Sequence, residues 1–146
     1  MKKLIKPRPE ADAASTARNA GPGRLIVAVY GVFALAATAR AAFQIATKFD
    51  QAPVAYLLSA FAAVVYIVAT VSLARSGPAS YKISVAAVSI EMFGVVFVGL
   101  FGLLDPAALP DDTVWSGFGM GYGFVPLILP IIGLWWLYKH RSAKHA

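Results

Sequence analysis

Residues 84–104, SVAAVSIEMFGVVFVGLFGLL, form an apolar run long enough to cross a lipid bilayer. One carboxylate, Glu91, stands near the middle of this run. A charged group at the centre of a bilayer costs at least about 2.5 to 3.5 kcal/mol to insert, so such a residue is usually paired, neutral or functional. The other polar groups of the chain are therefore weighed first as partners for Glu91.

The composition of the 146-residue chain is that of an integral membrane protein. Hydrophobic residues make up 59% and charged residues only 14%, with a mean hydropathy of +0.69. Soluble domains hold about 45 to 50% apolar and about 25% charged residues. The net charge of +6 does not indicate a nucleic-acid partner, because the basic residues stand at the ends of apolar runs. The absence of cysteine excludes disulfides, thiolate catalysis and cysteine-ligated metal centres.

Three further apolar stretches accompany this run. Together the four stretches predict an all-α membrane protein with four transmembrane helices in an up-down bundle. Gly77-Pro78 forces a turn between the second and third stretches. An acidic, non-helical loop, DPAALPDDTVW, separates the third stretch from the fourth. The four expected helices are residues 25–47, 53–74, 83–104 and 116–138.

Two basic tails flank this transmembrane domain of residues 25–138, a disordered one at 1–24 and a shorter one at 139–146. With both tails in the cytoplasm, eleven of the thirteen Lys and Arg residues lie on the cytoplasmic side and Lys48 lies outside. Because short cytoplasmic segments carry the excess of Lys and Arg, we expect a multi-pass plasma-membrane protein with both termini inside.

The first stretch also has features of a secretory signal peptide. Residues 25–37 match the length of its apolar region, and Ala37-Thr38-Ala39 offers a cleavage site. However, the leader would be unusually long, and the apolar pattern continues to about the 20 residues that span a bilayer. We expect the first helix to be retained, with cleavage as the alternative.

Tryptophan residues predict the length of the fourth helix. Trp115 at one end and Trp135 and Trp136 at the other enclose 19 residues, or about 28 Å of helix. That length matches a hydrocarbon core of about 30 Å with aromatic side chains at both interfaces. We therefore expect Trp115 to mark the outer interface.

Glu91 belongs to a stripe of mostly small residues along one face of its helix. Small residues let helices approach closely in lipid, so we expect Glu91 to face another helix and not the acyl chains. The stripe consists of Ser84, Ala87, Glu91, Gly94, Val98 and Gly102.

Depth in the bilayer, counted from each helix midpoint at about 1.5 Å per residue, sorts the candidate partners. Tyr66 lies at about the depth of Glu91, whereas Arg40 lies nearer the outer side, level with Ser59 and Tyr122. A direct Arg40–Glu91 ion pair has to close about 10 Å along the bilayer normal, which a tilt of about 20° allows. The depth count therefore favours a neutral Glu91 hydrogen-bonded to Tyr66, and the ion pair is the alternative. These five residues form the candidate intramembrane polar network.

Arg40 stays charged and must find acceptors of its own. Pro126 and Pro130 lack backbone N–H groups, which frees the carbonyls of Tyr122 and Pro126 within the fourth helix. We expect Arg40 to donate to the Tyr122 carbonyl, with stacking on the Tyr122 ring as a further contact. The alternative is that Arg40 extends along Gln44 to the outer headgroups.

The run SGFGMGYGF contains two overlapping GxxxG pairs, Gly117 with Gly121 and Gly119 with Gly123. It is not the GxGxxG fingerprint of dinucleotide sites, because the glycines alternate and no βαβ unit surrounds them. Close helix packing is the expected use. A broken helix of the kind that lines transporter sites is the alternative.

Asp111-Asp112 resembles the start of the DDxxD motif that binds magnesium diphosphate, but Trp115 replaces the third acid and the match fails. The aspartates of this loop would hold a cation only loosely, because hard cations need more oxygen ligands. His140 and His145 stand in a solvated basic tail. We therefore predict no metal ion, no cofactor and no catalytic residue.

Three stretches carry a family resemblance: GRLIVAVYGVFALAATAR, APVAYLLSAFAAVVYIVATVSLA and TVWSGFGMGYGFVPLILPIIGLWWL. They are similar to small, uncharacterised four-helix integral membrane proteins of high-GC Gram-positive (actinobacterial) bacteria. The resemblance spans residues 23–138 and implies a four-helix fold in the plasma membrane, with no catalytic or binding residue to carry over. DoxX-like four-helix proteins are similar in size and form a weaker resemblance.

These observations predict a non-enzymatic accessory or assembly partner of a larger membrane complex. The apolar stretches contain no His, Cys or paired acids that would support nucleophilic, metal or acid–base chemistry. The expected partners are membrane lipids and other membrane proteins or a second copy of the chain, and not nucleic acid. The alternative is a small proton-coupled transporter or channel that uses Glu91, with Arg40 setting its protonation.

Overall fold

The computed structural model describes residues 21–108 and 112–140, and within them the chain is helical and contains no β-strand. Most of the two tails predicted at the termini lies outside the described residues. The elements in chain order are α2 (Pro22–Lys48), η1 (Phe49–Gln51), α3 (Pro53–Ala74), α4 (Pro78–Leu104), η2 (Pro106–Ala108), η3 (Ser116–Tyr122) and α5 (Val125–Lys139).

Three helices, α2, α3 and α4, are long and apolar enough to cross a membrane. Helix α3 has the predicted bounds. Helices α2 and α4 begin earlier than predicted, at Pro22 and Pro78, because proline fits the first turn of a helix, where its missing N–H group has no partner to lose. Each has 27 residues and is therefore about 40 Å long.

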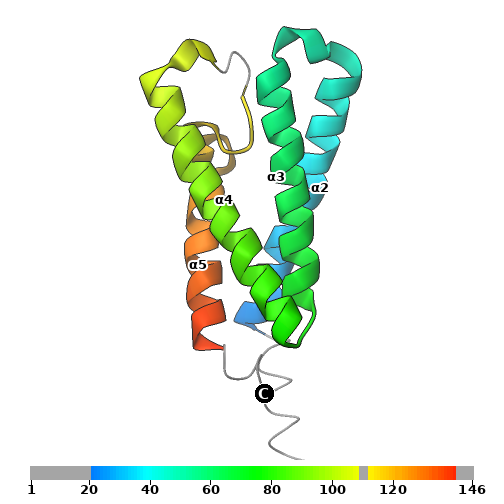
Figure 1. The fold of residues 1–146 in the computed structure, drawn as a ribbon, viewed down its shortest axis with the longest axis vertical. Helices are drawn as coiled ribbons and strands as arrows, with labels where there is room; N and C mark the ends of the chain where they lie inside the picture. The colour runs from blue at the N-terminus through cyan, green and yellow to red at the C-terminus, as the bar shows by residue number, and fades with distance from the viewer. Residues whose placement is uncertain (1–20, 109–111, 141–146) are drawn as a thin grey trace, which may run out of the picture.

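The helices pack in the order in which they occur in the chain. Helix α2 packs against α3, α3 against α4, and α4 against both η3 and α5, whereas α2 and α5 contact each other only sparsely (Figure 1). Helix α5 occupies only the lower half of the view, and the chain above it is irregular. The seam between α2 and the last segment is therefore the least tightly closed side of the molecule.

The segment predicted as the fourth helix, residues 116–138, is broken at the glycine run, which was the alternative to close helix packing there. Gly117, Phe118 and Gly119 have positive φ angles of 60°, 61° and 83°, and Phe124 has a φ of 62°. The axes of η3 and α5 differ by 98°. Left-handed residues cannot continue a right-handed helix, and Pro126 favours a new helix start. Helix α5 keeps 15 residues, or about 22 Å, which is shorter than a hydrocarbon core of about 30 Å.

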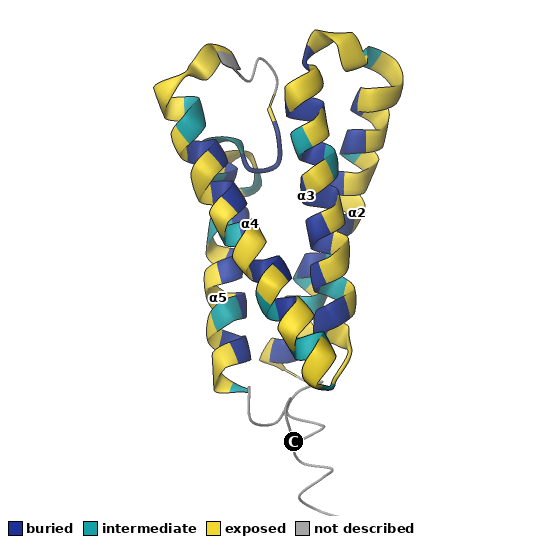
Figure 2. Cartoon of the chain, in the orientation of Figure 1, coloured by how far each residue is buried: buried dark blue, intermediate teal, exposed yellow. Residues whose placement is uncertain are grey.

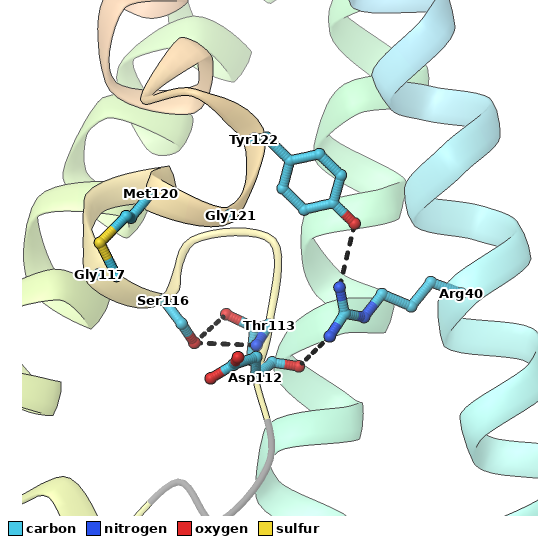
Figure 3. Close-up of a pocket in the computed structure, with 8 residues that line it drawn as sticks. All are labelled: Arg40, Asp112, Thr113, Ser116, Gly117, Met120, Gly121 and Tyr122. Atoms are coloured by element: carbon cyan, nitrogen blue, oxygen red, sulfur yellow. Dashed lines mark hydrogen bonds between the residues drawn. The ribbon is translucent and has the colours of Figure 1, made fainter.

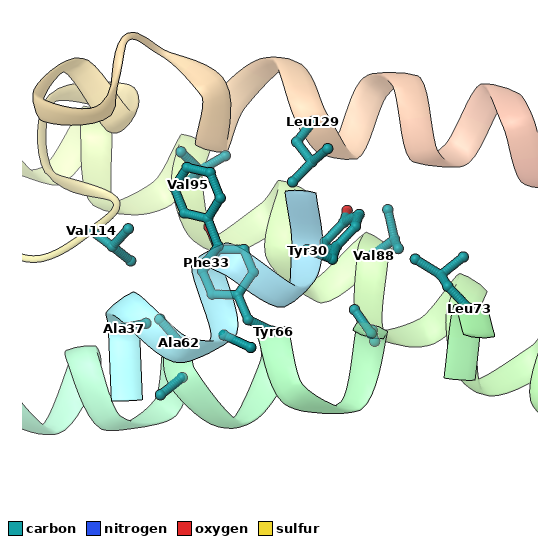
Figure 4. Close-up of a cluster of buried hydrophobic side chains, with 14 of the residues drawn as sticks. Tyr30, Phe33, Ala37, Ala62, Tyr66, Leu73, Val88, Val95, Val114 and Leu129 are labelled. Carbon is teal, nitrogen blue, oxygen red and sulfur yellow. The ribbon is translucent and has the colours of Figure 1, made fainter. Parts of the chain in front are cut away.

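Buried side chains line the inside of the bundle and exposed apolar side chains cover its outside (Figure 2). The stripe predicted around Glu91 faces inward, except for the half-exposed Gly102. Figure 4 shows aromatic and branched side chains of α2, α3, α4 and α5 meeting in one cluster. Large outward residues such as Leu35, at 76% exposed, and Phe93, at 71%, suit contact with lipid.

Trp115 lies inside this cluster and not at the interface predicted from the tryptophan spacing. Its side chain is 1% exposed, and its indole packs over Gly94 in the middle of α4. A Cβ atom on Gly94 would come within 2.5 Å of the indole ring. The chain before η3 therefore turns inward, and Gly94 leaves the space that the indole fills.

Replacing Gly94 by alanine should lower the thermal unfolding midpoint of the protein in detergent. The added methyl group meets a buried indole that is hydrogen-bonded in place, and overpacking of this kind costs about 1 to 3 kcal/mol. Gly102→Ala is the matched control, because a Cβ at Gly102 has no neighbour within 4 Å. Equal midpoints for the two variants would contradict the packing of Trp115 on Gly94.

Candidate functional site: a buried carboxyl and an arginine pocket

Glu91 is completely enclosed and is hydrogen-bonded to Tyr30. The Tyr30 hydroxyl, on α2, donates to Oε1 of Glu91 at 2.5 Å, and both residues are 0% exposed. Gly133 of α5 lies beside the same hydroxyl, since a Cβ there would be 3.3 Å from it. The absence of a side chain at Gly133 lets α5 close over the pair. One hydrogen bond thus joins α2 to α4 beneath α5.

Tyr30 was not among the partners expected for Glu91, because Arg40, with its charge, was the partner considered from the first helix. Helix α4 runs diagonally across the bundle (Figure 1), so residues of unequal depth meet. The sequence feature that could have identified Tyr30 is its hydroxyl group, a hydrogen-bond donor within the first apolar stretch. In a bilayer such a group needs an acceptor, and Glu91 offers one.

Tyr66, the partner expected for Glu91, lies next to its carboxyl group and interacts with it. The Tyr66 hydroxyl accepts a hydrogen bond from Nε1 of Trp115 at 2.9 Å. Its ring centroid is 6.1 Å from that of Tyr30 and 6.3 Å from that of Trp115. Oε2 of Glu91 is buried without a hydrogen-bond partner. The carboxyl is therefore surrounded by aromatic side chains and tied at one oxygen.

Arg40 reaches the broken segment that precedes α5. Its Nη1 donates to the Tyr122 hydroxyl at 3.0 Å, and its Nη2 donates to the backbone carbonyl of Asp112 at 2.9 Å (Figure 3). The expected acceptor was the Tyr122 carbonyl. The left-handed residues of η3 change the path of the chain, and the Tyr122 ring extends toward α2. Arg40 and Glu91 bond different partners and form no ion pair.

The alternative path for Arg40, along Gln44 to the outer headgroups, is not the one taken. Arg40 is half-buried and bonded to the loop, and Gln44 is itself 4% exposed, with a buried Oε1 that has no hydrogen-bond partner. Ser59 is 2% exposed and its Oγ likewise lacks a partner. Ser59 therefore does not join the polar groups with which it was predicted to act.

A pocket of about 360 Å³ opens beside Arg40, between α2 and η3. Hydroxyl groups and glycines make up much of its wall, and Thr113 and Ser116 are linked to each other across 3.2 Å. The lining residues are Arg40, Asp112, Thr113, Ser116, Gly117, Met120, Gly121 and Tyr122.

One aromatic residue connects the pocket with the buried carboxyl. The Phe33 ring centroid lies 5.6 Å from that of Tyr66 and 5.7 Å from that of Tyr122. The structure thus separates the predicted network into two centres, Glu91 with its aromatic neighbours and Arg40 with the loop. Within residues 21–108 and 112–140, no three His, Cys, Asp or Glu side chains are grouped to hold a metal ion; Asp111 and His145 lie outside the described residues.

Tyr30→Phe should destabilise the protein by about 1 to 3 kcal/mol, because it leaves a buried acceptor of Glu91 without a donor. Unfolding in mixed detergent micelles measures this loss. Glu91→Leu removes the other partner, and the double variant Tyr30→Phe/Glu91→Leu completes a cycle with an expected coupling on the order of 1 kcal/mol. Additive effects of the two changes would show that the hydrogen bond does not stabilise the fold.

Comparison with known protein families, with curated proteins and with solved structures finds no match to this chain. The resemblance to four-helix proteins of high-GC Gram-positive bacteria therefore stays a prediction.

Proposed function

We propose that this chain is a non-enzymatic membrane protein that acts as an accessory or assembly partner of a larger membrane complex. The observation that carries the proposal is a row of stacked aromatic side chains on the outside of α4. The ring centroids of Phe93 and Phe97, and those of Phe97 and Phe101, are both 5.8 Å apart, with interplanar angles of 13° and 11°. Phe93 and Phe97 are 71% and 52% exposed.

A stacked row of this kind suits contact with a second transmembrane helix. Phenylalanine offers a large contact area with few rotatable bonds, and aromatic residues are enriched at protein interfaces. The three rings are spaced four residues apart, so they form a ridge that fits a groove on a partner helix. In lipid, helices associate through such packing because no hydrophobic force drives them together.

The buried polar groups fit the same proposal. Glu91 is 0% exposed and held by Tyr30, and aromatic side chains surround it. An enclosed carboxyl that ties two helices together suits a structural role better than proton-coupled transport, which requires access from water. Its unpartnered Oε2 is the feature that speaks for transport. We therefore place transport through Glu91 second.

The proposal includes four membrane crossings with both termini in the cytoplasm. The eleven Lys and Arg residues assigned to the cytoplasm support this orientation. Helices α2, α3 and α4 would each cross once, and the fourth crossing would consist of the irregular segment before α5 together with α5. Non-helical backbone is tolerated at membrane depth where protein buries it or where it lines a cavity, and the segment from Thr113 to Trp115 is buried.

Stoichiometric co-purification tests the accessory role. The chain, extracted from native membranes in mild detergent, should bring down another membrane protein at a constant ratio. Phe93→Ala/Phe97→Ala should reduce that ratio at least about tenfold, since buried aromatic contacts dominate interface energies. Val32→Ala/Leu35→Ala is the control, because it truncates residues that are 63% and 76% exposed on α2. Recovery of the chain alone, or equal loss in both variants, would contradict the proposal.

Cysteine labelling tests the four crossings, and the chain contributes no cysteine of its own. Three exposed residues serve as single sites: Gln51 between α2 and α3, Ser76 between α3 and α4, and Lys139 at the end of α5. In intact cells a membrane-impermeant maleimide should label Gln51→Cys alone. Ser76→Cys and Lys139→Cys should react only after permeabilisation. Labelling of Lys139→Cys from outside would mean that the last segment enters and leaves on the same side.

A further inference from the structure

We propose that the pocket between α2 and η3 binds a small organic monocarboxylate through the guanidinium of Arg40. This site is separate from the aromatic row on α4 and goes beyond the accessory role. The pocket holds about 360 Å³, which is the lower part of the range of ordinary ligand sites. Arg40 stands within an apolar span, where a charged group is usually functional.

The bonds that Arg40 makes leave its charge available to a ligand. The Tyr122 hydroxyl and the Asp112 carbonyl, which accept hydrogen bonds from Arg40, are uncharged oxygens. They fix the direction of the guanidinium, which has five N–H donors, and use two of them. A carboxylate matches the planar fork of the remaining donors, and partly buried surroundings strengthen the attraction.

A carboxylate in the pocket wall limits how much negative charge a ligand can carry. Arg40 contributes a positive charge and Asp112 contributes a carboxylate that also lines the pocket. In Figure 3 the carbonyl of Asp112 faces Arg40, while its carboxylate extends toward Ser116. A second negative charge on the ligand would add to the repulsion from this carboxylate. A single carboxylate at Arg40 keeps that repulsion smaller and still gains the attraction of the guanidinium.

The rest of the wall provides hydrogen bonds and space. The Tyr122 hydroxyl accepts from Arg40 and keeps its own proton to donate. A Cβ atom on Gly121 would have no neighbour within 4 Å, and Gly121 does not have the positive φ of Gly117. Gly121 lines the pocket, so a larger side chain there has open space beside the pocket and causes no backbone strain. The Met120 side chain adds an apolar surface for the carbon chain of the ligand.

The break in the last segment gives the pocket its position. Discontinuous helices line the binding sites of many transporters, because irregular backbone at membrane depth is tolerated where it lines a cavity. Here η3 meets α5 at 98°, and the pocket lies on the seam where α2 and the last segment are least tightly packed. A ligand can reach this seam from the outer aqueous phase or from the lipid.

Calorimetric titration of the purified full chain in lipid nanodiscs tests the proposal with three probes. Sodium butyrate represents a soluble carboxylate, and sodium oleate represents a carboxylate supplied by the lipid phase. Methyl butyrate has the carbon chain of butyrate but no charge. We expect saturable binding of butyrate or oleate, and the probe that binds identifies the source. No saturable binding of either carboxylate, or equal binding of methyl butyrate, would overturn the proposal. Binding of inorganic phosphate in place of both carboxylates would also overturn it.

Two variants locate the bound carboxylate. Arg40→Gln should weaken binding about tenfold or more, because it removes a charged hydrogen-bond donor. Gly121→Leu should also weaken binding, because the larger side chain fills the pocket while Arg40 is kept. This variant tests the site even if Arg40→Gln fails to fold. Gly102→Leu is the control: a Cβ at Gly102 also has no neighbour within 4 Å, and Gly102 does not line this pocket. Unchanged binding in Gly121→Leu would place the ligand elsewhere.

Discussion

The hydrogen bond between Tyr30 and Glu91 is the constraint on which the rest of the bundle depends. A carboxyl group at this depth has no water to solvate it, so the protein has to supply its surroundings. The donor comes from α2, the acceptor from α4, and Gly133 lets α5 approach the pair. This contact therefore holds together α2, α4 and α5, which lie far apart in the sequence.

Around this bond, small and large residues alternate so that the aromatic side chains fit. Trp115 fills the space that Gly94 leaves on α4 and donates to the Tyr66 hydroxyl. The Phe33 ring contacts the rings of both Tyr66 and Tyr122, and the Tyr122 hydroxyl accepts a hydrogen bond from Arg40. The buried carboxyl and the charged arginine, which do not touch, are thus positioned by one set of packed rings.

Sequence reasoning predicted the helices better than the contacts between them. The bounds of α3 and the inward face of α4 follow from hydropathy and from the spacing of small residues, which are local properties. The break at η3 depends on three consecutive left-handed residues, and Phe118 gives no sign of that conformation in sequence. Tyr30 was missed as the donor because Arg40, with its charge, was the residue of the first helix that the sequence marked as a partner for Glu91.

The short α5 gives the two halves of the molecule different cross-sections. Around the lower part of the view in Figure 1, α5 completes the ring of α2, α3 and α4; around the upper part, irregular chain takes its place. Lipids of one leaflet would therefore surround helices alone, while those of the other would also meet a segment with bends and glycines. In a bilayer, a molecule with this asymmetry would have different neighbours in each leaflet.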